Sequence, residues 1–447
     1  MTLPPGWIRC TLDDIKAPVE FAIAGGPFGS DLSAADYTPT GVPVIRGCNL
    51  GHGERRFYAD DLVFVSDARA DALRRSLAAP GDVLFTQRGT VGQVGLVPDG
   101  LPWPRLLLSQ SQMKLTCDPA RADPEYVYYW CRGPEAQQHV RSSTITAGVP
   151  HTNLAALKRT PITLPPLAEQ RAIAATLAAL DRRISLCADQ RASLAAVVDL
   201  LFKTWFLEHA PVHSKAAGAR HPGVDAAADA LFPARVVERD GRPVPEGWTL
   251  APLTSLAEFH NGTPFALADF CPPDQGLPVV KIAELKQGVT RQTRFSAGRD
   301  GARALARGDL LFAWSGNPDT SIDTFLYTGG PAWLNQHIYK VVPPRPTDRA
   351  FLFGLLRALR PTFVGLARAK QTTGLGHVAL KDLRALVVCA PPEPLLAAFD
   401  RATAPYFARI FGCDDLAASL ARTRDALHPA LLSAEVRLSP FAKATGP

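Results

Sequence analysis

The chain has 447 residues, of which 47% are hydrophobic and 20% charged, a balance that is typical of ordered proteins with two or more domains and excludes a disordered chain. The net charge of +6 agrees with a polyanionic partner but does not require one. The eight cysteines include no C-x-x-C pair, which argues against a zinc site or a disulfide scaffold, and no apolar run approaches the ~18 residues that cross a bilayer, so we expect a cytoplasmic protein without a membrane partner.

Residues 1–163 contain short apolar runs that are separated by Gly, Pro and Asn, a pattern that predicts a domain rich in strands and loops. One of these runs is Gly81-Asp-Val-Leu-Phe85, and a polar loop with Gln87 and Arg88 follows it. The domain ends at a double proline, Pro165-Pro166.

A long helix is predicted next, from about Leu167 to Glu208, within a spacer that covers residues 164–210. Its apolar residues fall on alternating steps of four and three, broken only by Arg191, which is typical of a coiled-coil seam. The predicted seam consists of Ile173, Leu177, Leu180, Ile184, Cys187, Leu194, Val198, Leu201 and Trp205. Residues 211–243 lack periodicity and are rich in Ala, Gly, Pro and Arg, which predicts a linker.

The rest of the chain repeats the first half. Pro4-Pro-Gly-Trp7 recurs as Pro245-Glu-Gly-Trp248, the run at Gly81 recurs at Gly308, and the double proline recurs as Pro391-Pro392. Ordered landmarks with a slowly changing offset are hard to produce by chance, so the sequence predicts a tandem duplication. The second copy then consists of a domain at 244–391, a distal helix at 392–435 and a tail at 436–447.

The second helix carries a matching apolar stripe, although Pro405 and Gly412 are expected to kink or delay it. A helix of ~40 residues is ~60 Å long and exceeds a domain of this size. We therefore expect the two stripes to be buried against each other; the alternative is that each helix covers its own domain. The second stripe consists of Phe399, Tyr406, Ile410, Cys413, Leu420, Leu427 and Leu431.

Several motifs together resemble those of the specificity subunits of type I restriction-modification systems. They are Pro4-Pro-Gly-Trp7, Gly81-Asp-Val-Leu-Phe-Thr-Gln-Arg-Gly89 and Leu164-Pro-Pro-Leu-Ala-Glu-Gln-Arg-Ala-Ile173. The segment Leu201-Phe-Lys-Thr-Trp-Phe206 resembles the usual end of the family's central spacer. The second copy departs from the pattern where Glu393-Pro-Leu-Leu396 replaces the Leu-Ala-Glu-Gln signature.

The resemblance implies an α+β fold: two tandem mixed α/β target-recognition domains, separated by two long helices that pair as an antiparallel coiled coil. Each domain would read one part of a split site in double-stranded DNA. The helices would set the gap between the parts and dock two methyltransferase subunits, and a restriction/translocase subunit would join for cleavage. The chain itself would be non-catalytic and hold no cofactor, because S-adenosylmethionine, ATP and Mg would belong to the partner subunits.

Candidate DNA-contacting residues are polar or basic, since Arg and Lys neutralise phosphates, Arg pairs with guanine, and Asn or Gln pairs with adenine. Residues 281–307 contain seven Lys or Arg, which indicates either a phosphate-contacting surface or an ordinary solvated face. The loops around Gln87, Ser315 and the two histidines are either DNA-facing or structural turns. The candidates are Arg46, Asn49, Arg55, Arg56, Gln87, Arg88, His151, Lys281, Lys286, Arg291, Arg294, Ser315, Asn317, Lys370, Gln371 and His377.

Two other functions remain open at the level of sequence. The chain could be a duplicated coiled-coil scaffold that binds proteins rather than DNA. It could also be a metal-dependent nuclease, because Asp274, Glu284 and Lys286 match a loose nuclease pattern, in which carboxylates hold a divalent metal. The first copy lacks the matching residues, which favours coincidence.

Overall fold

The computed structural model describes residues 3–51, 55–290, 292–371 and 374–438. The chain divides into two compact units: unit 1 contains Met1–Ala188 and Asp415–Pro447, and unit 2 contains Asp189–Asp414. Each unit therefore includes part of both long helices. The candidate Arg291 lies outside the described residues.

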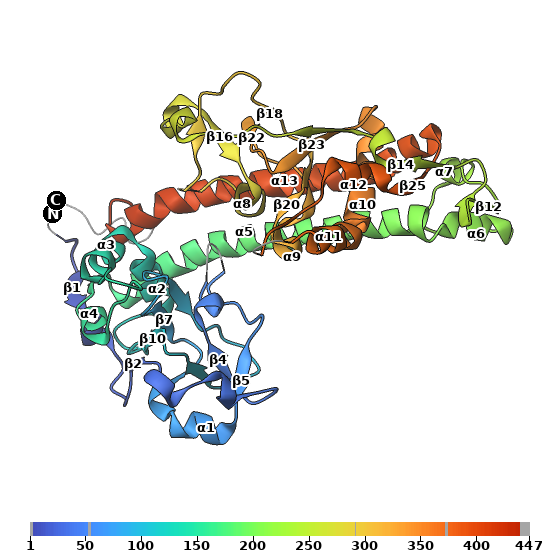
Figure 1. The fold of residues 1–447 in the computed structure, drawn as a ribbon. Helices are drawn as coiled ribbons and strands as arrows, with labels where there is room; N and C mark the ends of the chain where they lie inside the picture. The colour runs from blue at the N-terminus through green and yellow to red at the C-terminus, as the bar shows by residue number, and fades with distance from the viewer. Residues whose placement is uncertain (1–2, 52–54, 291, 372–373, 439–447) are drawn as a thin grey trace. The chain divides into compact units, whose positions relative to one another are not determined.

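The described residues of unit 1 form three sheets of short strands (Figure 1). Strand β4 pairs with β9 in parallel, while the other pairs are antiparallel. Its apolar runs form strands that are buried on both faces, as at Val83–Thr86. The sheets are β1 (Ile8–Thr11) with β11 (Pro161–Leu164); then β2 (Ile23–Gly25), β10 (Gln112–Leu115), β7 (Val83–Thr86) and β8 (Val94–Leu96); then β3 (Tyr37–Thr38), β5 (Val63–Val65), β4 (Val42–Ile45), β9 (Leu106–Leu108) and β6 (Leu77–Ala78). Its short helices are α1 (Asp67–Ala72), α2 (Pro124–Arg132), α3 (Pro134–Ser143) and α4 (Leu154–Lys158).

Unit 2 repeats the strand order of the two main sheets of unit 1, except that β3 has no counterpart among its described strands. The sheets are β14 (Thr249–Pro252) with β25 (Val387–Ala390); then β15 (Glu258–Asn261), β23 (Ile338–Val342), β19 (Leu310–Ala313) and β21 (Asp323–Leu326); then β17 (Phe295–Ser296), β16 (Leu277–Val280), β22 (Ala332–Leu334) and β18 (Ala304–Leu305); and β20 (Ser315–Gly316) with β24 (Gly376–His377). Its short helices within the repeat are α8 (Ile282–Gln287), α9 (Pro318–Ser321), α10 (Arg349–Ala358), α11 (Arg360–Ala369) and α12 (Leu380–Ala385).

The duplication predicted from the sequence is confirmed by the strand pairing. In unit 1 the only parallel pair among the described strands places Val44 beside Leu107, and in unit 2 the equivalent pair places Val279 beside Trp333. The order β2-β10-β7-β8 matches β15-β23-β19-β21. The two units are thus two copies of one fold.

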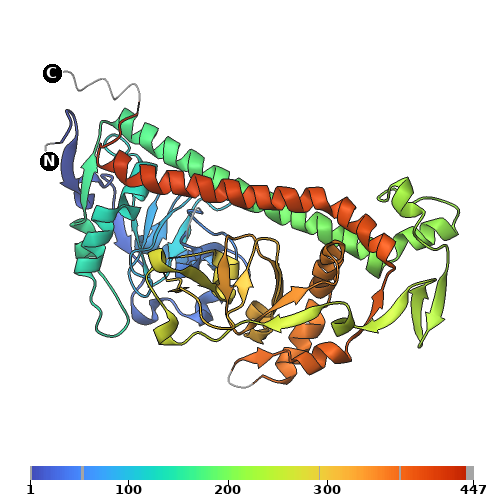
Figure 2. The ribbon, with the colours of Figure 1, turned by 90° about the horizontal axis from the view of Figure 1, so that it is seen from above.

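The long helices α5 (Leu167–Phe202) and α13 (Glu393–Leu432) contain 36 and 40 residues. In unit 1 the start of α5, with Ile173 and Leu177, shares a core with Leu431 at the end of α13. In unit 2 the end of α5 shares a core with Phe399 near the start of α13. Within each unit the two helices therefore lie side by side in opposite directions, which confirms the antiparallel pairing (Figure 2).

Burial follows the two predicted stripes. The helix α13 begins at Glu393 and continues through Pro405 and Gly412, both of which are exposed, so the expected delay does not occur. After Phe202 the first helix ends in a π-helical turn, Lys203–Leu207. The buried members of the stripes are Ile173, Leu177, Ile184, Cys187, Val198, Trp205, Phe399, Ile410, Cys413 and Leu431, and the half-buried members are Leu180, Leu194, Leu201, Tyr406, Leu420 and Leu427.

Residues 211–243, predicted as a linker, are folded. They contain α6 (Ala210–Ala216), α7 (Ala226–Asp229) and most of a hairpin of β12 (Val236–Arg239) and β13 (Arg242–Pro245). Their apolar residues, such as Val212 and Phe232, join the core of unit 2. This folding could not be predicted from the sequence, because the apolar residues are too irregularly spaced to show a helical or strand period.

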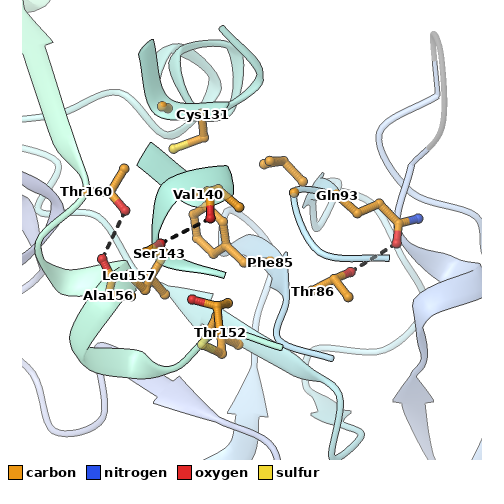
Figure 3. Close-up of a pocket in the computed structure, with 14 residues that line it drawn as sticks. Phe85, Thr86, Gln93, Cys131, Val140, Ser143, Thr152, Ala156, Leu157 and Thr160 are labelled. Carbon is orange, nitrogen blue, oxygen red and sulfur yellow. Dashed lines mark hydrogen bonds between the residues drawn. The ribbon is translucent and has the colours of Figure 1, made fainter. Parts of the chain in front are cut away.

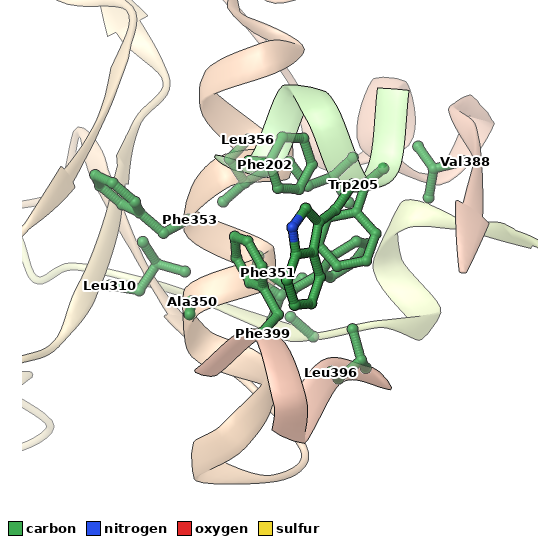
Figure 4. Close-up of a cluster of buried hydrophobic side chains, with 14 of the residues drawn as sticks. Phe202, Trp205, Leu310, Ala350, Phe351, Phe353, Leu356, Val388, Leu396 and Phe399 are labelled. Atoms are coloured by element: carbon green, nitrogen blue, oxygen red, sulfur yellow. The ribbon is translucent and has the colours of Figure 1, made fainter. Parts of the chain in front are cut away.

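An aromatic cluster forms the core of unit 2 where α5, α10 and α13 meet (Figure 4). The ring of Phe399 lies 5.4 Å from that of Trp205 and 6.2 Å from that of Phe202. Phe351 on α10 packs against Phe202 at 5.6 Å.

In the described part of the chain no single helix is long and apolar enough to cross a membrane. The helices α10 and α11 have sufficient length and apolar composition only when taken together, and they are bent by 50° relative to each other.

Candidate nucleic-acid interface

Two polar loops of unit 1 meet beyond the end of β7. The backbone N–H of Gly89 donates to the carbonyl of Pro150 (2.9 Å), and that of Thr152 donates to the carbonyl of Gln87 (2.9 Å). An antiparallel bridge joins Arg88 to His151. The structure thus brings together two candidate segments that lie about sixty residues apart in the sequence.

Unit 2 repeats this junction. Strand β20 pairs with β24 so that Ser315 faces His377, and the backbone N–H of Val378 donates to the carbonyl of Trp314 (2.8 Å). Ser315 is half-buried and His377 is exposed. The two units therefore present equivalent loops that carry different side chains.

A cleft of about 400 Å³ lies beside the junction in unit 1. It collects side chains from the end of β4, the loop after β7 and the turn between β9 and β10. The lining residues are Leu32, Tyr37, Arg46, Gly47, Thr86, Arg88, Gly89, Thr90, Gln93, Ser109, Gln110, Ser111 and Gln112. None of them is acidic.

The polar groups of this cleft differ in their bonding. Gln110 donates to the carbonyls of Gly29 and Leu32 and so holds the loop after β2. Arg46 donates through Nη2 to the carbonyl of Asp61 (2.5 Å). The Nε of Arg46 and the Nε2 of Gln112 are buried without an acceptor among the described residues.

Gln110 and Gln112 were not among the candidates taken from the sequence. Gln110 aligns with Gln336 in the second copy, so its repetition was the available signal. Gln112 aligns with the apolar Ile338, and no pattern marked it. Only the pairing of β10 with β7 brings Gln112 next to the loop that carries Arg88.

Two candidates in unit 1, Asn49 and Arg56, have partners within the fold. Asn49 is fully buried: its side chain accepts from the N–H of Arg46 (2.9 Å) and donates to the carbonyl of Tyr58 (3.0 Å). Arg56 forms an ion pair with Glu125 and lies over the ring of Tyr129 at 5.6 Å. Asn49 is therefore enclosed by the fold, whereas Arg56 is half-buried and held by its ion pair.

Other candidates are engaged in similar ways. Asn317 caps α9 by accepting from the N–H groups of Asp319 and Thr320. Lys370 forms an ion pair with Asp382, and Lys286 donates to the carbonyl of Thr320.

The remaining candidates keep exposed or half-buried positions. Gln87 and His151 are half-buried, and Lys281 and Gln371 are exposed. Arg55 is exposed, with its guanidinium 5.8 Å from the ring of Tyr58, while that of exposed Arg294 lies 5.9 Å from the ring of Phe270. These positions leave their polar groups within reach of solvent or of a ligand.

A second, apolar cavity lies behind the junction, between β7, α3 and α4 (Figure 3). Its volume is about 30 Å³, close to that of one water molecule. The hydroxyls of Ser143 and Thr160 donate to the carbonyls of Val140 (3.2 Å) and Ala156 (3.3 Å). It is too small for a nucleobase.

The motifs Pro4–Trp7 and Leu167–Gln170 contact each other and have a structural role. The indole N–H of Trp7 donates to Glu169 (3.1 Å), whose two oxygens also accept from Arg437 (2.9 Å each). In the second copy Leu395 occupies the position of Glu169, and the ring of Trp248 packs against Phe206 at 5.9 Å instead. Where the second copy departs from the Leu-Ala-Glu-Gln signature, an aromatic contact of Trp248 therefore replaces the polar contact that Trp7 makes in the first copy.

The comparisons with known proteins agree with this architecture. A family described as the type I restriction modification DNA specificity domain matches residues 76–196. The type I restriction enzyme MjaIX specificity subunit of Methanocaldococcus jannaschii is 22% identical over 98% of this chain and 95% of its own length. Residues 76–196 thus match a type I restriction-modification DNA specificity domain, and the whole chain is similar to a specificity subunit.

The fold is similar to that of a solved S subunit. The crystal structure of the type I restriction-modification S subunit from M. genitalium aligns over 96% of this chain and 98% of its own, at 14% identity and a TM-score of 0.53. The HsdS subunit from Thermoanaerobacter tengcongensis aligns over 98% of this chain and 99% of its own, at 19% identity and a TM-score of 0.36.

The residues that matched a nuclease pattern are engaged otherwise: Glu284 accepts from the backbone N–H of Lys281 (3.0 Å) and from the hydroxyl of Thr293 (3.0 Å). Among the described residues no group of three His, Cys, Asp or Glu is placed to hold a metal. Glu284 occupies the place of Asn49 in unit 1 and closes the same turn.

Proposed function

We propose that this chain reads a bipartite DNA target, with the loop junction of each unit reading one part. The observation that carries the proposal is the repeated junction, in which Arg88 faces His151 in unit 1 and Ser315 faces His377 in unit 2. The two junctions share one backbone arrangement, and side chains that differ in their hydrogen-bond donors and acceptors recognise different base edges. The two parts of the target therefore differ in sequence.

The partners follow from the family: DNA, a methyltransferase subunit and a restriction subunit. Two methyltransferase subunits per chain are supported by the duplication, because a repeated surface offers two equivalent binding places. The chain needs no cofactor of its own in this arrangement, and S-adenosylmethionine, ATP and Mg act in the partner subunits. The mass of the purified complex, measured by light scattering, tests the ratio of two methyltransferases to one specificity subunit.

A domain exchange tests the reading of DNA. Residues 1–163 are replaced by the first domain of another specificity subunit, and the methylated sequence is determined by sequencing the genome of a host that carries the complex. We expect one part of the target to change and the other to stay. A change in both parts or in neither would contradict the assignment.

Salt dependence separates a DNA reader from a protein-binding scaffold. Binding that neutralises phosphates releases counterions, so the affinity for random duplex falls steeply as the salt concentration rises. We expect that fall for the complex of this chain with its methyltransferase. Affinity that does not respond to salt would favour the scaffold.

A further inference from the structure

The cleft of unit 1 presents hydrogen-bond donors that lack partners within the protein. The Nε of Arg46 and the Nε2 of Gln112 are buried without an acceptor in the described ranges, although both residues line the cleft. Gln112 has no exposed surface, and its Oε1 already accepts from the hydroxyl of Ser109. Because an unpaired buried donor is costly, these groups indicate a ligand that supplies acceptors.

Arg88 stands on the rim of the same cleft. Its side chain is exposed and forms no hydrogen bond or ion pair with the residues that the structure describes. Its backbone is fixed on both sides, by Gln87 bonded to Thr152 and by Gly89 bonded to Pro150. A long cationic side chain on a fixed backbone reaches a ligand at a small cost in loop entropy.

The chemistry of the cleft selects among base edges. In the major groove guanine offers two acceptors, N7 and O6, whereas adenine offers one acceptor and one donor, and cytosine offers a donor. A cleft lined by two arginines and no carboxylate matches a guanine. On the basis of the proposed function, we propose that Arg88 reads a guanine in the first part of the target by donating to its O6 and N7, above the donors of Arg46 and Gln112.

Unit 2 provides an internal control. Ser315 occupies the position of Arg88, Ile338 that of Gln112 and Lys281 that of Arg46. The second unit thus keeps the same backbone pairing, but Ser315 and Ile338 replace the arginine and the glutamine of the first unit. Reading of guanine through this cleft belongs to the first part of the target only.

The test uses the complex of the full chain with its methyltransferase and the target found by methylome sequencing. Each guanine of the duplex is replaced in turn by 7-deazaguanine, which keeps base pairing but removes the N7 acceptor. We expect one replacement in the first part to weaken binding roughly tenfold to a hundredfold. Arg88→Ala should weaken binding to the unmodified target to a similar extent and should no longer respond to that replacement.

The control is Arg74→Ala, which removes an exposed arginine of unit 1 outside the cleft and should leave the response to 7-deazaguanine unchanged. If Arg88→Ala weakened all duplexes equally and lowered the salt dependence, Arg88 would contact a phosphate and the proposal would be wrong. It would also be wrong if the first part contained no G·C pair or ignored every replacement while the complex still selected its target. A complex with no selectivity at all would overturn the proposed function, and this proposal with it.

Discussion

At the scale of single residues, a buried polar network in unit 1 joins α2 to the two long helices. Asp181 on α5 accepts from the hydroxyl of Tyr129 (2.7 Å) and from Arg424 on α13 (3.0 Å). The ring nitrogen Nε2 of His428 lies 2.8 Å from the carbonyl of Tyr129 and donates to it. Because every member depends on a partner from another element, the network fixes which faces of these helices meet.

The histidine of this network predicts a loss of stability in acid. Burial lowers the pKa of His428, and the nearby Arg132 and Arg424 lower it further, against the opposing effects of the Tyr129 carbonyl and Asp181. Below about pH 6.5, the usual pKa of histidine, the unfolded chain therefore binds a proton at this position more readily than the folded chain does. Stability is complete above about pH 6.5 and falls as the pH drops from there towards the lowered pKa of the folded state.

Urea unfolding at pH 7.5 and pH 5.5 measures this effect. We expect the native chain to unfold at lower urea at pH 5.5, and His428→Gln to reduce the difference. Burial also lowers the pKa of His209, so part of the difference should remain. His337→Gln, at an exposed position, serves as the control and should keep the full difference. An unchanged difference in His428→Gln would show that this histidine does not contribute.

The residues of the cleft show how far a sequence predicts a site. Arg88 could be identified because it follows a strand that is repeated in the second copy. Asn49 and Arg56 have the same chemistry, but their partners Tyr58 and Glu125 become neighbours only when the loop closes on α2. Residue type therefore suggested donors, while tertiary contacts decided which of them stay available.

At the scale of elements, α10 approaches α5 closely at Gly354. A Cβ atom added there would lie 2.3 Å from Cδ2 of Phe202, which is 2% exposed within the aromatic core. Gly365 on α11 has no atom within 4 Å of the same position. Gly354 therefore allows α10 to pack closely on α5, whereas no close contact requires a glycine at position 365.

Alanine substitutions at these glycines should have opposite effects. Gly354→Ala overpacks the contact with α5 and should destabilise the protein by about 1–3 kcal/mol. Gly365→Ala meets open space in a helix and should be neutral or stabilise it by up to about 1 kcal/mol. Urea unfolding of the two variants measures the contrast. Equal stability of the two variants would contradict the close packing of α10 on α5.

The long helices were predictable to within a few residues, because each carries a sustained apolar period and follows a double proline. The segment at 211–243 was not, since α6, α7 and the β12–β13 hairpin are too short to show a period. Their stability comes from core contacts such as those of Phe232 with Trp205, 5.3 Å apart. Tertiary burial, rather than local pattern, folds this segment.

At the scale of the whole molecule, the proposed function makes the helices a determinant of target spacing. Four residues inserted after Ala188 in α5 and after Asp414 in α13 lengthen each helix by about 6 Å, and one base pair rises about 3.4 Å. We expect the non-specific gap of the target to grow by one or two base pairs while both specific parts remain. Methylome sequencing reads the new gap directly.

Insertion in α5 alone is the matched control. It shifts one stripe against the other, so we expect lower stability and weaker methylation rather than a longer gap. A gap that stays the same after the double insertion would show that the helices do not set the spacing.

The division of unit 1 between the two ends of the chain affects how the protein is made. Its residues up to Ala188 leave the ribosome before unit 2 exists, but the segment from Asp415 is synthesised last. At elongation rates of about 5–20 residues per second, Ile173 and Leu177 wait about thirteen to fifty seconds for the side chain of Leu431. A nascent chain thus carries an uncovered apolar surface, and a stop codon near residue 414 would harm the first half of the protein as well as the last.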